Sequence, residues 1–112
     1  MSFGRKAILK CEVENLRNYK VTHWTNRLET KGYELFQVAW VRVDTQTILT
    51  IHNNVITRNP RISLSRPGEN KWYLHMNSVQ ENDRGWYMCQ INTDPMVHRS
   101  GYLEVVGKKI AE

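Results

Sequence analysis

Side chains able to do chemistry are sparse and dispersed along the 112 residues of this chain. No G-x-S-x-G motif surrounds any serine, and the six glycines form no phosphate-binding loop. Glu12 and Glu14 flank Val13 on one expected strand, where both carboxylates would be solvated. The four histidines have no metal-ligand spacing relative to the cysteines. The sequence therefore predicts a protein that is not an enzyme and needs no cofactor or metal.

The two cysteines, Cys11 and Cys89, form no C-x-x-C motif, and a bond between them would close most of the chain. A disulfide of that span contributes roughly 4–5 kcal/mol in the loop-entropy model. It would also place the domain in an oxidising compartment. Two reduced, buried thiols are the alternative that the cysteines alone leave open.

Short alternating or β-branched segments predict that the chain is almost entirely strand. Their expected ranges are 6–13, 38–43, 47–52, 61–66 and 101–106. The apolar parity of Trp72, Leu74 and Met76 predicts a further strand, and that of residues 87, 89 and 91 another. Turn residues such as Pro67-Gly68 separate the segments, so we expect one all-β sandwich or barrel.

Cys11, Trp40 and Cys89 occur in the order Cys…Trp…Cys, and residues 83–89 read D-x-G-x-Y-x-C. In this combination the sequence resembles the immunoglobulin fold. The resemblance implies that the two cysteines join the two sheets and that Trp40 packs on their disulfide. It also implies that the Tyr87 hydroxyl returns to the backbone at the corner between two strands.

Two further features sharpen this resemblance. Arg61 is placed to pair with Asp83 across the bottom of the domain, as in similar variable-type domains. The stretch between Trp40 and Arg61 is long enough for the additional strands C′ and C″. We therefore expect residues 1–112 to form a single variable-type immunoglobulin-like β-sandwich with one inter-sheet disulfide.

Residues 38–52, 55–59, 85–96 and 101–106 look like the first domain of the Dpr-interacting proteins, which are invertebrate neuronal surface receptors related to lachesin and the IgLON proteins. The resemblance implies cell–cell recognition through a membrane-distal domain that binds a Dpr-like immunoglobulin domain. Residues 22–37 depart from the pattern and read as a B–C loop insertion of about 16 residues. Residues 107–112 also depart from it.

Strand parity predicts an interaction face independently of the family. If Trp40 and Cys89 point inward, their neighbours on strands C and F point outward together. On C′ we expect Ile48 outward with the polar residues of the same parity, and Leu49 and Ile51 inward. An apolar centre with a polar rim is typical of an interface. The residues predicted for this face and the adjoining turn are Ala39, Val41, Val43, Gln46, Ile48, Thr50, His52, Met88, Gln90, Asn92, Asp94 and Met96.

The central contacts are expected at Val41, Val43, Ile48 and Gln90. A charge at Val41 or Ile48 is expected to abolish pairing and leave folding intact. Because a sheet face also pairs with its own copy about a two-fold axis, both a homodimer and a heterodimer are expected.

Three alternatives stay open. The insertion could fold back and cover the patch with Trp24, Tyr33 and Phe36. It could instead make the domain a soluble ligand-binding module that binds through this loop. A basic cluster offers glycosaminoglycan contact and consists of Arg58, Arg61, Arg66 and Lys71.

The net charge of +5 is small and scattered, which argues against nucleic-acid binding. No apolar run is long enough to span a bilayer, and no signal peptide or N-x-[ST] acceptor is visible. We expect an extracellular, cell-surface location, with any membrane attachment supplied by an anchor outside this sequence.

Overall fold

The structure is a computed structural model that describes residues 5–13, 37–92 and 96–105. Its elements in chain order are β1 (Ala7–Glu12), β2 (Val38–Arg42), β3 (Thr47–Ile51), β4 (Asn54–Val55), β5 (Ile62–Ser65), β6 (Lys71–Met76), the 3-10 turn η3 (Glu81–Asp83), β7 (Gly85–Ile91) and β8 (Val97–Leu103). No helix among these residues is long and apolar enough to cross a membrane. Most of the predicted insertion lies outside the described residues.

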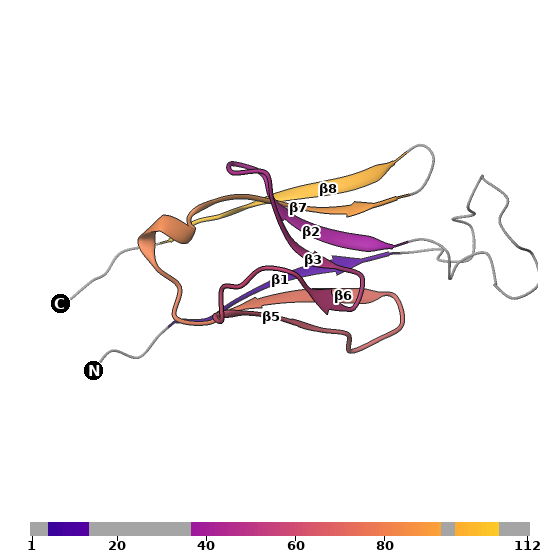
Figure 1. The fold of residues 1–112 in the computed structure, drawn as a ribbon, viewed down its shortest axis with the longest axis horizontal. Helices are drawn as coiled ribbons and strands as arrows, with labels where there is room; N and C mark the ends of the chain where they lie inside the picture. Colours follow the sequence, from indigo (N-terminus) through magenta and orange to yellow (C-terminus); the bar gives the residue numbers. More distant parts are fainter. Residues whose placement is uncertain (1–4, 14–36, 93–95, 106–112) are drawn as a thin grey trace, which may run out of the picture.

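The strands form two antiparallel sheets that pack face to face (Figure 1). The smaller sheet has the order β1-β6-β5, and the larger has the order β4-β3-β2-β7-β8. Consecutive hairpins alone would not produce these orders, because the chain crosses between the sheets after β1, β4 and β6. This arrangement confirms the predicted variable-type sandwich, with β3 and β4 as the additional C′ and C″ strands.

The core lies between the sheets because the inward positions of their strands are apolar. Along β6 the buried residues are Trp72, Leu74 and Met76, each at most 1% exposed. Along β7 the alternate residues Tyr87 and Ile91 are buried in the same cluster. Burying a large apolar side chain contributes about 1.5–3 kcal/mol, so this alternation drives the two sheets together.

Cys11 and Cys89 form the predicted disulfide across the core, at a sequence separation of 78. Trp40 is 4% exposed, and its indole Nε1–H donates a hydrogen bond of 3.1 Å to the backbone carbonyl of Trp72 in the opposite sheet. The disulfide and this hydrogen bond connect the two sheets at their centre.

The end of the sandwich that carries η3 is held by side-chain hydrogen bonds. The Tyr87 hydroxyl donates to the Asp83 carbonyl at 2.6 Å, which is the tyrosine corner implied by the sequence. Arg61 binds the Asp83 carboxylate with both terminal nitrogens, at 2.7 and 3.0 Å. Burial favours the neutral acid, but hydrogen bonds from Arg61 and from the Gln80 backbone hold the pKa of Asp83 below its usual value.

The last strand differs most from its predicted bounds. β8 begins at Val97 rather than at residue 101, and each of its residues pairs with β7. The residues that precede Gly101 are mostly polar and exposed, so they carry no apolar alternation to indicate a strand. These residues form a strand because their backbone groups pair with β7, which the local sequence pattern alone does not indicate.

Candidate protein-interaction face

The outward surface of the five-stranded sheet, here called the front face, is defined by the register of β2 and β7. Trp40 points into the core, so its neighbours on β2 point away from it. Ala39 lies opposite Gln90, and Val41 lies opposite Met88. These four predicted residues therefore share one surface at the centre of the sheet.

A β-bulge interrupts the pairing between β2 and β3. Val41 pairs with Ile48, whereas Trp40 pairs with Thr50, so Leu49 is an extra residue on β3. Paired residues of adjacent strands point to the same side of a sheet. Ile48 therefore lies on the front face as predicted, and Thr50 points inward with Trp40.

The bulge makes three predicted orientations on β3 and the turn after it wrong. Thr50 is fully buried, and its hydroxyl oxygen accepts a hydrogen bond of 3.2 Å from the backbone N–H of Trp40. His52 is half-buried, with its ring centroid 5.7 Å from that of Trp72. Ile51 lies opposite outward-facing Ala39. Counting parity along a sequence fails at a bulge, because the extra residue reverses every later position.

Val41 faces outward but is only 9% exposed. It does not belong to the core cluster, so its neighbours within the front face cover it. Ile48 flanks it on one side and Met88 on the other. A charge at Val41 would therefore be buried, which corrects the expectation that such a variant folds normally.

The exposed apolar centre consists of Val43, 38% exposed, and Ile48, 46% exposed. Val43 follows the last residue of β2 and continues the pairing with β7, since its N–H donates to the carbonyl of Trp86 at 2.9 Å. Gln46 lies in the turn to β3, where its N–H donates to the Val43 carbonyl at 3.2 Å. It is exposed and adjoins the apolar centre, as a rim residue should.

Two aromatic residues on the front face were absent from the sequence prediction. Trp86 and Tyr102 are paired across β7 and β8 and have the outward parity of Met88. They are 48% and 44% exposed, and their rings meet edge to face with centroids 5.3 Å apart. Counting back two residues from Met88 predicts an outward Trp86, so the sequence contained that signal.

One end of the front face lies just after the last residue of β7, at Asn92. Asn92 and Gln37 exchange two hydrogen bonds, in which the Gln37 N–H donates to the Asn92 side-chain oxygen at 2.6 Å and the Asn92 N–H donates to the Gln37 carbonyl at 3.1 Å. Met96 is 50% exposed beyond this turn. Asp94 lies outside the described residues.

Two of the basic residues considered for glycosaminoglycan contact already make contacts within the fold. Arg61 is held by Asp83, as described above. Arg66 stacks on the Trp72 ring at 3.8 Å and donates from Nε to the Lys71 carbonyl at 2.6 Å. Because two of the four guanidinium and ammonium groups are already engaged in the fold, the geometry does not favour this alternative.

Burial lowers the pKa of His52 below 6.5, and the nearby positive charge of Arg66 lowers it further. The neutral imidazole is thus the form that the fold prefers. The described ranges contain no group of three or more His, Cys, Asp or Glu side chains arranged to hold a metal ion.

Two packed antiparallel sheets, a core disulfide with a tryptophan beside it and a tyrosine corner define a variable-type immunoglobulin domain. Residues 1–106 match the immunoglobulin V-set domain family, and the chain belongs to that family. The family and its adhesion-complex neighbours are non-enzymatic, so this domain is not an enzyme.

Solved structures of other immunoglobulin domains resemble this chain. It shares 45% identity and a TM-score of 0.73 with a chain in the structure of Dpr1 IG1 bound to DIP-eta IG1, covering 93% of this chain and 83% of that one. With the ZIG-8 IG1 homodimer it shares 27% identity and a TM-score of 0.71, covering 93% and 73%. These similarities confirm the resemblance to Dpr-interacting proteins.

A curated relative gives the same indication. The chain is 34% identical over 70 residues to Zwei Ig domain protein zig-8 of Caenorhabditis elegans. The match covers 62% of this chain but only 26% of the relative, so the chain corresponds to about a quarter of that protein's length.

Proposed function

We propose that the front face binds another immunoglobulin V-set domain, including a second copy of this one, in cell-surface recognition. The observation that carries the proposal is the exposed apolar surface formed by Val43, Ile48, Trp86 and Tyr102, each 38–48% exposed on one side of one sheet. A water-facing sheet surface normally carries polar residues at these positions. An apolar patch of this kind marks a site of association.

The relatives support this function. Dpr1 IG1 was solved bound to DIP-eta IG1, ZIG-8 IG1 as a homodimer, and ZIG-8 with RIG-5 as an IG1–IG1 heterodimer. Domains of this type therefore pair both with copies of themselves and with different members. A standard interface of this kind buries on the order of 800 Å² on each partner.

The location follows from the same class. Immunoglobulin domains of adhesion proteins are extracellular, and a disulfide persists in that oxidising environment. We propose that the domain acts at the surface of invertebrate neurons, as the resemblance implies.

The first test replaces Ile48 with aspartate. Ile48 is 46% exposed at the centre of the face, so a charge there blocks apolar contact without entering the core. Self-association measured by sedimentation equilibrium should fall at least about tenfold, with an unchanged melting temperature. Binding to immobilised Dpr1 IG1 and DIP-eta IG1, measured in parallel, covers heterophilic partners.

Ile8→Asp is the matched control, because Ile8 is 49% exposed on a strand of the other sheet. It should associate like the wild-type protein. Equal association of all three proteins, or equal weakening by both variants, would refute the front face as the binding surface.

A second test concerns the B–C insertion, which we infer spans residues 22–37. If the sheet binds the partner, deletion of these residues should leave pairing within about threefold of wild type. Complete loss of binding by a deletion variant that still melts cooperatively would assign recognition to the loop instead.

A further inference from the structure

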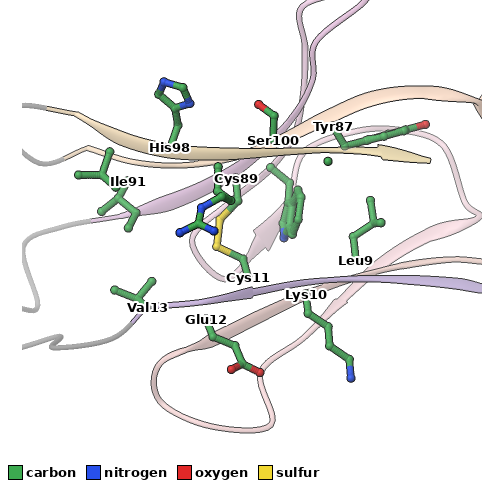
Figure 2. A pocket seen from close by; sticks show the side chains of 14 residues that line it. Leu9, Lys10, Cys11, Glu12, Val13, Tyr87, Cys89, Ile91, His98 and Ser100 are labelled. Carbon is green, nitrogen blue, oxygen red and sulfur yellow. A yellow bond between two sulfur atoms is a disulfide. The ribbon is translucent and has the colours of Figure 1, made fainter. Parts of the chain in front are cut away.

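The strand β8 places on the front face a histidine that the sequence prediction did not include. His98 lies opposite Gln90, and Gln90 lies opposite Ala39, so the three residues form one row across β8, β7 and β2. Paired residues of adjacent strands point to the same side of a sheet. Figure 2 shows His98 and Ser100 pointing away from the core disulfide, which is the direction of the front face. His98 is exposed, so its imidazole is accessible to a partner that covers this face.

The side chains that surround His98 on the front face carry no charge. Its neighbours lie across β7 and β2, at the diagonal positions along β7, and at the flanking outward positions of its own strand. They are Ala39, Met88, Gln90, Asn92, Met96 and Ser100. Within the described residues, a protonated imidazole at His98 therefore meets no carboxylate on its own surface.

The charged groups of the adjoining elements lie elsewhere. Arg99 has the opposite parity to His98 and so belongs to the inward side of β8. Arg42, at the end of β2, lies opposite inward-facing Tyr87, and its guanidinium is 5.5 Å from the centroid of that ring. Glu104 follows the end of β8, about 20 Å from His98 along an extended chain. None of these charges is placed to compensate one on His98.

Covering His98 with a partner makes a charge on its ring costly. Histidine side chains ordinarily titrate near pH 6.5, so an exposed imidazole is mostly neutral at about pH 7.5 and mostly protonated at about pH 5.5. Burial without a counter-charge disfavours the protonated form. A partner surface without a carboxylate therefore binds the neutral form more tightly, and binding weakens as the pH falls.

A second copy of this chain supplies a partner surface of this kind. In a pair related by a two-fold axis, both partners contribute the same surface. The uncharged surroundings of His98 would then belong to both sides of the interface. His98 would also be present twice, so the cost of protonation would be incurred twice in each dimer.

We propose that His98 is a contact residue of the front face and that it makes self-association of this domain decline in mildly acidic solution, with two imidazoles acting in each dimer. This inference rests on the proposed function, because it adds a contact and a form of regulation to the same face. Neutral solution favours the dimer, and acidification through the range in which histidine titrates releases it.

The test varies the number of imidazoles in the pair. His98→Gln keeps a polar side chain and removes the titrating ring. Surface plasmon resonance of wild type on wild type, of wild type on immobilised variant and of variant on variant measures pairs with two, one and no such rings. Between about pH 7.5 and 5.5, each buried ring should raise the dissociation constant roughly tenfold. The expected increases are therefore roughly a hundredfold, tenfold and less than about twofold.

Three further variants are controls. His75→Gln makes the same substitution on β6, where His75 lies opposite exposed Ile8 on the other sheet. His52→Asn removes the histidine whose burial affects folding, and melting temperatures at about pH 5.5 check that every protein is folded. Asp94→Asn removes a carboxylate that lies outside the described residues but close to His98 in the sequence. All three should retain the pH dependence of wild-type association.

The possible outcomes separate this inference from the proposed function. An equal pH dependence of the wild-type and His98→Gln pairs would overturn the role of His98 while leaving the front face as the binding surface. Loss of the pH dependence in His75→Gln, His52→Asn or Asp94→Asn would also overturn it, because another group would then control association. A folded wild-type protein that does not self-associate even at about pH 7.5 would refute both self-association and this inference.

Discussion

Individual residues divide sharply between those that hold the fold and those that are free to bind. Trp40, Tyr87 and Asp83 are buried, and each is hydrogen-bonded through its side chain to another part of the fold. Trp86 and Ile48 are about half exposed to solvent, although their side chains are large and apolar. Exposure of such side chains is a cost that folding alone does not explain, so their role is sought in association.

Trp86 is expected to be the strongest single contributor to pairing. Tryptophan is enriched among residues that dominate interfaces, where truncation costs about 2 kcal/mol or more. Trp86→Ala should therefore weaken association by roughly thirtyfold, as measured by sedimentation or surface plasmon resonance. Thermal unfolding should change little, because the ring is 48% exposed. Unaltered affinity would place the interface away from the aromatic pair.

Elements show where prediction from the sequence succeeded and where it could not. The parity of β2 and β7 was predicted from Trp40 and Cys89, because both strands are regular and buried on one face. The orientation of Thr50 was not predictable, since the bulge at Leu49 leaves no mark in the apolar pattern. Likewise, Tyr102 belongs to a strand whose first half is polar and exposed.

The turn between β3 and β4 is expected to make stability sensitive to pH. The pKa of His52 is lowered in the folded state by burial and by Arg66, so the unfolded chain binds a proton at higher pH than the folded one. The stability from the neutral ring is complete above pH 6.5 and declines as the pH falls below it.

Melting temperatures between about pH 7.5 and 5.5 measure this decline. His52 has a φ of 53°, so asparagine, which tolerates this conformation, is the appropriate replacement. His52→Asn should flatten the pH dependence in this range. An unchanged slope in the variant would assign the effect to another group. Asp83 acts in a separate window, because its lowered pKa removes stability only in more acidic solution.

The molecule as a whole depends on the disulfide that cross-links its two sheets. The Cys11–Cys89 bond spans 78 residues, and the loop-entropy model assigns such a link roughly 4–5 kcal/mol. The double variant Cys11→Ala, Cys89→Ala should therefore lose about 4 kcal/mol of unfolding free energy in urea titrations. A loss below about 1 kcal/mol would mean that packing around Trp40 suffices to hold the sheets.

Along β7, consecutive residues serve the interior and the surface in turn. Tyr87, Cys89 and Ile91 build the core, while Trp86 and Met88 with Gln90 face outward. Substitutions in the outward set leave the inward set untouched, so duplicated genes can diverge at these few positions without losing the scaffold. Specificity is a difference between the affinities for competing partners. Because the outward and inward residues alternate, domains with the same core can differ in the partner that they prefer.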